Sequence, residues 1–184
     1  MARGENSLEP TATTQDVRYR EAARTYAAAI ERLARGYEAD ADLARDLVQD
    51  IHAALWRSFA YFEGQCSLRS WVYRIAHNVA VSHIQAARRA RPASGRCGLE
   101  EIDQLAAPDD IEREASESQL ARRLLATIHR LKPADRQVML LYLEELTAEE
   151  IGDVTGLSAG AVATRIHRLK SLLAEAFQTE EFDA

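Results

Sequence analysis

Residues 147–173 constrain the fold more than any other stretch, because they carry the signals for two short helices and the turn between them. Thr147 followed three positions later by Glu150 is a capping box, in which each side chain binds the other residue's backbone N–H at a helix start. Gly156 tolerates the left-handed conformation that ends a helix, and Ser158 is a typical N-cap for the next one. The stretch therefore predicts a helix-turn-helix unit.

The second helix of this unit has a buried stripe and a distinctive outer face. Apolar residues recur at helical spacing along the stripe: Val162, Ile166, Leu169 and Leu173. The outer face starts with small residues and continues with polar and basic ones: Thr164, Arg165, His167, Arg168 and Lys170. That pattern is typical of a helix that enters the major groove of DNA. A helical hairpin with a solvated basic face stays open as the alternative, because helix-turn-helix patterns also arise by chance.

The rest of the chain is also helical in composition. Glycine and proline number only 8 and 4 among 184 residues, and no alternating apolar runs bounded by turn residues occur. An apolar fraction of 47% is enough to form cores. We therefore expect an all-α protein with two small helical domains joined by a flexible acidic linker.

The net charge of −6 argues against a nucleic-acid partner, but the distribution of charge reverses that impression. Residues 65–98 contain no acidic residue and six arginines: Arg69, Arg74, Arg88, Arg89, Arg91 and Arg96. The acidic residues are concentrated in 100–117, 144–153 and 175–183. Two basic regions in an acidic chain predict local DNA contacts without strong indiscriminate binding.

Breaks in helical periodicity divide the chain into two domains. Pro92 ends the first helical region, and the acidic stretch after it contains glycine and proline. The predicted parts are a flexible tail (1–15), a first helical domain (16–92), a linker (93–118), a second helical domain (119–177) and an acidic tail that frays (178–184).

The helix predicted from Leu68 to about Arg89 places aromatic residues beside arginines and an amide. These are the side chains that bind unpaired bases, because aromatic rings stack, arginines bind phosphate and amides bind base edges. Trp71 is more simply interpreted as a core aromatic, and the role of Tyr73 stays open.

No catalytic or metal chemistry is predicted. The chain has no glycine-rich phosphate loop, metal-spaced histidine pair or nucleophile elbow. Cys66 and Cys97 are the only cysteines and are expected to be reduced thiols, with no metal or cofactor. No apolar run could cross a bilayer and the first residues lack the apolar core of a signal peptide, so we expect a soluble cytoplasmic protein without membrane insertion.

The two halves together resemble a known family. Residues 44–59 and 67–92 resemble region 2, and residues 131–173 resemble region 4, of bacterial extracytoplasmic-function sigma factors in the sigma-70 family. The joint occurrence in this order is far more specific than either half. The resemblance implies a nucleoid-associated protein that binds core RNA polymerase and recognises the minus-thirty-five and minus-ten elements. It also implies promoter melting and initiation of transcription for a stress- or signal-responsive regulon.

The resemblance also implies polymerase contacts and partners. Residues expected to dock on the clamp helices of the largest polymerase subunit are Asp46, Leu47, Gln49 and Asp50. The flap of the second subunit and promoter DNA are the other expected partners, and an anti-sigma factor is expected to restrain the protein.

The expected minus-ten contacts come from a loop and the helix after it. Phe62, Gln65 and Ser67 would complete a pocket for a flipped base, with Asn78 near a captured base. The helix would further contribute Arg74, His77, Arg88 and Arg89, the last two on backbone phosphates.

The expected minus-thirty-five contacts lie on the second helix of the helix-turn-helix unit. Thr164, His167 and Arg168 match positions that reach base edges. Arg165 and Lys170 complete this DNA-binding set, with Arg165 on phosphate or bracing the fold.

Some positions depart from the family pattern. Arg45 stands where an acidic residue is usual, Ala163 where a basic one is common, and residues 82–85 lack the usual acidic–basic pair. These departures bear on the promoter sequence rather than on the class. The competing hypothesis is a dimeric helix-turn-helix regulator that binds operators without polymerase, although it leaves the basic aromatic helix unexplained.

Overall fold

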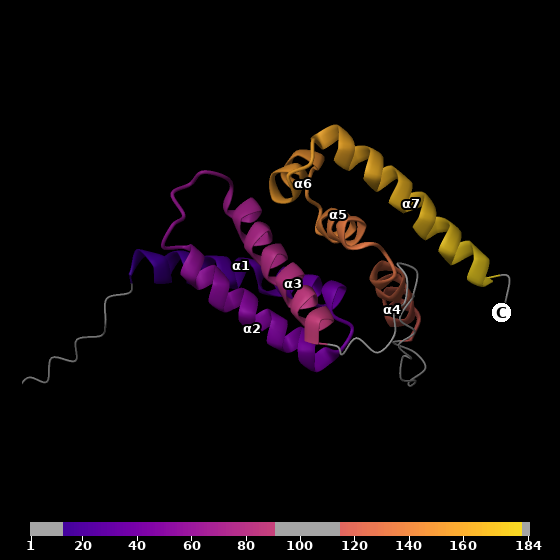
Figure 1. Cartoon of the computed structure of the whole chain (residues 1–184), viewed down its shortest axis with the longest axis horizontal. Coiled ribbons are helices and arrows are strands. Elements are labelled where there is room, and N and C mark those ends of the chain that lie inside the picture. The colour runs from indigo at the N-terminus through magenta and orange to yellow at the C-terminus, as the bar shows by residue number, and fades with distance from the viewer. Residues whose placement is uncertain (1–12, 91–114, 182–184) are drawn as a thin grey trace, which may run out of the picture.

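The computed structural model describes residues 13–90 and 115–181, except for the side chains of residues 88, 90, 115–118 and 176–181. Most of the expected N-terminal tail and linker, with Arg91, Arg96 and Cys97, lie outside the described residues, as do residues 182–184. The described part contains only helices, which confirms the all-α prediction (Figure 1). The helices are α1 (Thr14–Tyr37), α2 (Ala41–Ser58), α3 (Leu68–Ala90), α4 (Ala115–His129), α5 (Pro133–Leu143), α6 (Ala148–Thr155) and α7 (Ala159–Glu181).

The first domain is a bundle of α1, α2 and α3 (Figure 1). Polar caps define the helix starts: Thr13 and Asp16 form a capping box on α1, and the Asp40 side chain accepts from two backbone N–H groups of α2. Trp71 packs against the core and its Nε1 donates to Ser58 Oγ at 3.0 Å, as expected of a core aromatic. Fully or almost fully buried side chains fill the bundle: Ile30, Leu33, Leu47, Ile51, Leu55, Phe59 and Val72.

The second domain contains the helix-turn-helix unit in α6 and α7, as the sequence predicts. Thr147 and Glu150 form the capping box, with Thr147 N–H donating to the Glu150 carboxylate at 2.9 Å. Gly156 ends α6 with a φ of 78°, a conformation that glycine adopts without steric cost. The Ser158 hydroxyl accepts from the backbone N–H of Ala161 at 3.3 Å, which places a capping residue at the start of α7.

Two helices are longer than the sequence analysis predicts. α4 begins at Ala115, inside the stretch interpreted as linker, and α7 continues to Glu181, inside the stretch interpreted as a fraying tail. Acidic composition favoured the interpretation as linker and tail. Neither extension contains glycine or proline, however, so nothing in the backbone opposes a helix there.

The two domains pack against each other, which the sequence analysis did not foresee. Glu144, at the end of α5, accepts from Arg32 of α1 at 2.7 and 2.6 Å and from the Tyr73 hydroxyl of α3 at 3.1 Å. The Arg69 guanidinium of α3 donates to the backbone carbonyl of Glu144. Glu144 therefore connects α1, α3 and α5.

Apolar side chains continue across the same junction. Leu140 of α5 lies so close to Gly36 of α1 that a Cβ at Gly36 would stand 2.3 Å from Leu140 Cδ2. Tyr73 is only 4% exposed and packs in a cluster with Ile151 and Val162 of the helix-turn-helix unit. The sequence leaves the role of Tyr73 open, and in this conformation its ring is part of the packed junction between the domains.

Candidate nucleic-acid and partner surfaces

The outer face of α7 presents the predicted upstream DNA-binding residues together. Thr164, His167, Arg168 and Lys170 are exposed, and Arg165 is half-buried. Thr164 Oγ1 donates to the backbone carbonyl of Gly160 at 3.0 Å, a local bond that leaves the hydroxyl oxygen free to accept another hydrogen bond. The small start of α7 would let the helix approach another surface closely.

Two arginines of this face share one carboxylate. Asp135, in the first turn of α5, lies 2.9 Å from Arg168 Nη2 through each of its oxygens and 3.4 Å from Arg165 Nε through Oδ1. The Asp135 side chain is 14% exposed, whereas that of Arg168 is 59% exposed. The sequence analysis missed Asp135, because it precedes its partners by about thirty positions with no local pattern to connect them.

A polar stripe runs along α3. Arg74, Asn78, Gln85 and Arg89 recur at helical spacing, and Asn78 and Arg89 are exposed. The Arg74 guanidinium donates to the backbone carbonyl of Asp153 in α6 at 2.8 Å, so the docked second domain covers the start of the stripe. Arg88 lies in α3, but its side chain is outside the described residues.

His77 departs from the expected DNA surface. It is 7% exposed, and its Nδ1 lies 2.5 Å from the Tyr37 hydroxyl oxygen. Burial disfavours the charged imidazolium and lowers the pKa of His77 to about 4. His77 faces inward because one step along a helix turns a side chain by about 100°, so the neighbour of exposed Asn78 points into the bundle.

The loop between α2 and α3 is anchored by Phe62. Its ring packs against Phe59 and Trp71, with centroid separations of 6.0 and 5.2 Å, and the Arg18 guanidinium lies over it at 5.8 Å. Gln65 and Ser67 are exposed on the loop. The Gln65 amide is bonded within the loop, because its Nε2 donates to the Tyr61 carbonyl at 3.1 Å and its Oε1 accepts from the Glu63 N–H at 2.8 Å. The loop therefore places exposed polar side chains beside packed aromatic rings, a combination that can bind a base.

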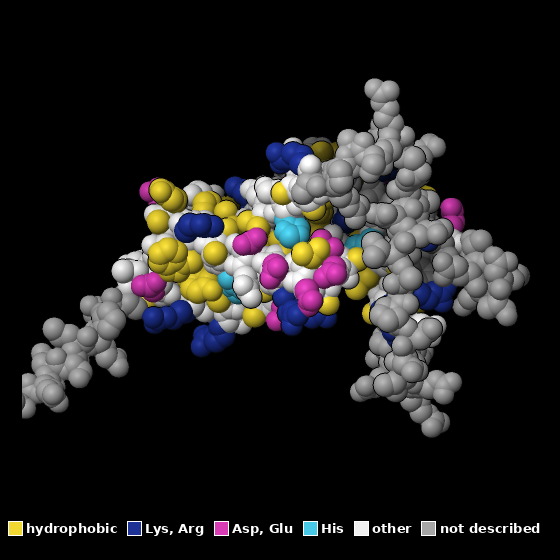
Figure 2. Space-filling view, turned by 60° about the horizontal axis from the view of Figure 1, so that its bottom comes forward, with side chains coloured by type: hydrophobic (Ala, Val, Ile, Leu, Met, Phe, Trp, Pro, Cys, Tyr) yellow, Lys and Arg dark blue, Asp and Glu magenta, His cyan; other side chains and the backbone are white. Residues whose placement is uncertain are grey.

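The acidic face of α2 contains three of the four predicted polymerase contacts. Asp46, Gln49 and Asp50 are exposed, and Figure 2 shows acidic side chains gathered on the face that carries α2. Leu47 is fully buried, so in this conformation it holds the helix in the core and cannot touch a partner. The Arg45 side chain forms an ion pair with Asp42 one turn earlier, and the Asp42 carboxylate offsets the positive charge of Arg45 on this acidic face.

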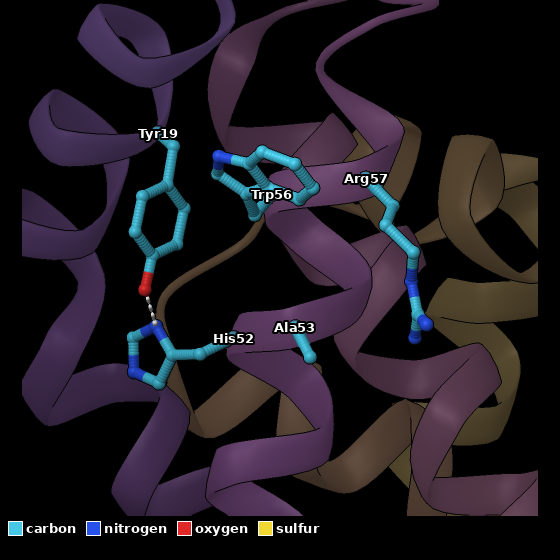
Figure 3. A pocket seen from close by; sticks show the side chains of 5 residues that line it. All are labelled: Tyr19, His52, Ala53, Trp56 and Arg57. Carbon is cyan, nitrogen blue, oxygen red and sulfur yellow. Dashed lines mark hydrogen bonds between the residues drawn. The ribbon is translucent and has the colours of Figure 1, made fainter. Parts of the chain in front are cut away.

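A shallow hollow lies between α1 and α2, lined by Tyr19, His52, Ala53, Trp56 and Arg57 (Figure 3). The Tyr19 hydroxyl is 3.3 Å from His52 Nδ1, and burial lowers the pKa of His52. Trp56 is 43% exposed, and its Nε1 donates to Asp16 at 2.9 Å. The hollow is open to solvent, and the Tyr19–His52 contact forms part of its wall.

The described residues contain no group of three or more histidine, cysteine, aspartate or glutamate side chains placed to hold a metal ion. Among the described helices, none combines the length and apolarity that crossing a bilayer requires.

Both halves of the chain match regions of one known protein family. The sequence pattern of sigma-70 region 2 matches residues 22–90, and that of sigma-70 region 4 matches residues 121–173. The ECF RNA polymerase sigma-E factor of Haemophilus influenzae is 31% identical over 141 residues, covering 72% of this chain and 74% of the relative. The RNA polymerase sigma factor CarQ of Myxococcus xanthus is 34% identical over 140 residues, covering 72% and 76%.

The fold is also known from a solved structure. CnrH, in a complex with the cytosolic domain of CnrY, matches with a TM-score of 0.63 and 23% identity over 88% of each chain. That likeness shows the same arrangement of helices.

Proposed function

Since the chain belongs to the extracytoplasmic-function group of the sigma-70 family and is an RNA polymerase sigma factor, we propose that it directs core polymerase to promoters through α2, α3 and α7. It recognises the minus-thirty-five and minus-ten elements, melts the promoter and initiates transcription of a stress- or signal-responsive regulon. The observation that carries the proposal is that one chain holds both an exposed basic helix-turn-helix face and a polar stripe, exposed beyond Arg74, in a domain whose loop is anchored on aromatic rings.

The two DNA elements fall to different domains. The outer face of α7 enters the major groove of the upstream duplex, where Thr164, His167 and Arg168 reach base edges. The loop and α3 take the melted minus-ten strand, with Gln65 and Asn78 supplying hydrogen bonds to a flipped base. Extruding a base costs a few kcal/mol of stacking, which the pocket must offset.

The acidic face of α2 binds the polymerase. Asp46, Gln49 and Asp50 meet the clamp helices of the largest subunit, where complementary charge steers association and fixes the register. The second domain meets the flap of the second subunit.

Restraint by an anti-sigma factor is a further part of the proposal. CnrH was solved with the cytosolic domain of CnrY, which supports an anti-sigma partner for a chain with the same fold. Because docking of α6 covers Arg74, this partner would act most simply by holding the two domains together.

Core binding and promoter selection test the function together. The full chain is expected to co-elute with bacterial core RNA polymerase and to support run-off transcription from particular promoters in a genomic pool. Reversing charge with Asp50→Lys should weaken core binding about tenfold or more, because like charges would then face each other across the interface. Glu21→Lys makes the same charge change on exposed α1 and should leave binding unaltered.

Two results would count against the proposal. Unchanged co-elution of Asp50→Lys removes that residue from the docking surface. If the wild-type chain does not bind core polymerase but binds particular duplex sequences by itself, it is instead an operator-binding regulator.

A further inference from the structure

We propose that Asp135 of α5 is a specificity-determining residue for DNA recognition by α7, because its carboxylate holds Arg168 for base edges and restrains both Arg168 and Arg165 from arbitrary phosphates. The inference rests on the proposed recognition of upstream DNA by α7. It assigns a DNA-selectivity role to a residue of α5, outside the helix that touches DNA.

The carboxylate is itself held in place. Asp135 lies in the first turn of α5, and its backbone N–H donates to the carbonyl of Lys132 at 2.9 Å. The N-terminal end of a helix carries partial positive charge, which favours a carboxylate there. The Asp135 side chain is only 14% exposed, so its carboxylate is a fixed negative charge next to α7.

The Asp135 carboxylate binds the two arginines differently. Arg168 donates to it through Nη2 alone, at 2.9 Å from both oxygens. Within the described part of the chain, its Nε and Nη1 have no hydrogen-bond acceptor, and the side chain is 59% exposed. Arg165 approaches Oδ1 through Nε at 3.4 Å and is 30% exposed. Arg168 is therefore oriented while keeping N–H groups for DNA, and Arg165 is held closer to the protein.

This arrangement penalises the wrong contacts. An arginine without a partner binds any phosphate within reach, and each such contact adds affinity without sequence information. Here, a phosphate brought to either guanidinium comes close to the Asp135 carboxylate, and the repulsion between these two negative groups offsets part of the attraction. A base edge carries no formal charge, so the outward N–H groups of Arg168 can meet it without that repulsion.

A purely structural role is the rival explanation, because the same ion pairs connect α5 to α7. The two explanations differ in what a neutral variant does. Loss of a brace lowers stability and weakens binding to all DNA, whereas loss of a selectivity device strengthens binding to arbitrary DNA and weakens discrimination.

The test uses the full chain assembled with core RNA polymerase and a library of duplex fragments randomised upstream of the start site. For Asp135→Asn we expect random-sequence duplex to bind about 3- to 10-fold tighter and the log–log salt dependence to steepen by about one, the effect of one added phosphate contact. The ratio of selected to random affinity should fall by at least the same factor. Asp135→Glu should restore much of the ratio, because it keeps the charge.

Glu149→Gln is the matched control, since it removes one exposed carboxylate from the same domain and should leave salt dependence and selectivity unchanged. Asp135→Ser provides a second uncharged variant if the amide fails to fold, as judged by its melting temperature. If the neutral variants fold and keep the wild-type salt dependence and the wild-type ratio of selected to random affinity, Asp135 only connects α5 to α7 and the inference is overturned. If the wild-type complex enriches no upstream sequence, the proposed function falls with it, so the two failures are distinguishable.

Discussion

The helices α3 and α7 both present basic side chains for DNA, but their arginines find partners in different places. Arg168 of α7 pairs with Asp135 of its own domain. Arg74 of α3 donates to the backbone carbonyl of Asp153, which belongs to the other domain. The surface of α7 is therefore complete within one domain, whereas part of the α3 surface is covered by its neighbour.

The DNA-facing surfaces of α3 and α7 therefore depend on different parts of the molecule. Movement of the two domains apart would leave the contacts of α7 intact and would uncover the start of the α3 stripe. We therefore expect binding to upstream duplex to depend on the core of the second domain, and binding to the minus-ten strand to depend on domain separation.

Truncation of matched core isoleucines should have the largest effect and tests whether the domains are independent. Ile151 of α6 and Ile51 of α2 are both fully buried, so replacing either by alanine should cost about 2–5 kcal/mol of stability. Ile151→Ala should abolish binding to upstream duplex while binding to a single-stranded minus-ten oligonucleotide persists, and Ile51→Ala should do the reverse. Circular dichroism during heating measures the stability. A single transition shifted equally by both variants would contradict the comparison.

Acidification should weaken the domain that carries α3. The pKa of buried His77 is lowered from 6.5 to about 4, so below pH 6.5 the unfolded state binds a proton that the folded state resists. The contribution of this histidine to stability should be complete above pH 6.5 and fall by up to about 3 kcal/mol by pH 4. Denaturant unfolding against pH measures it as the difference between wild type and His77→Gln.

His167 is the natural control for that experiment, because it is exposed on α7. His167→Gln should follow the wild-type pH profile. If His77→Gln and wild type lose stability in parallel between pH 6.5 and 4, the buried imidazole does not govern the acid response of α3.

Removal of the carboxylate at the domain junction should have a smaller effect and tests the covering of α3 directly. Glu144→Ala leaves the buried Tyr73 hydroxyl without this acceptor, which should cost about 1–3 kcal/mol at the junction. The partner Arg32 is 59% exposed, so water can replace its contact at little cost. We expect the domains to spend more time apart and the minus-ten oligonucleotide to bind faster.

Energy transfer between two dyes measures that separation. One dye sits on Cys66 and the other on α7 through Ser171→Cys, with Cys97→Ser to leave two labelling sites. Glu145→Gln removes an exposed neighbouring carboxylate and should leave the dye distance unchanged. An unaltered distance in Glu144→Ala would show that the apolar contacts alone hold the junction.

Local features were predictable because short-range rules determine them. The Thr147 capping box, the left-handed Gly156 and the stripe with Val162 and Leu169 were all predicted correctly, as were the exposed side chains of α7. Each depends on residues within one or two helical turns of one another.

The remaining features depend on contacts between residues far apart in the chain. Leu47 and His77 were assigned to binding surfaces by resemblance alone, and only the packing of the three-helix bundle shows that they face inward. The sequence analysis assigned no role to Asp135 or Glu144. Their roles follow from arginines 33 and 112 positions away, which no local pattern connects.

That separation along the chain has a consequence for the order of synthesis. Most contacts of α1, α2 and α3 are with one another, within residues 13–90, so we expect the bundle to fold once this segment has left the ribosome. Glu144, Leu140 and α6 are translated later, and at about 5–20 residues per second the delay amounts to several seconds. Each new copy therefore passes through an interval in which the α3 stripe is folded and uncovered. A protein that captures this face would find it most accessible on the nascent chain, before the second domain exists to compete.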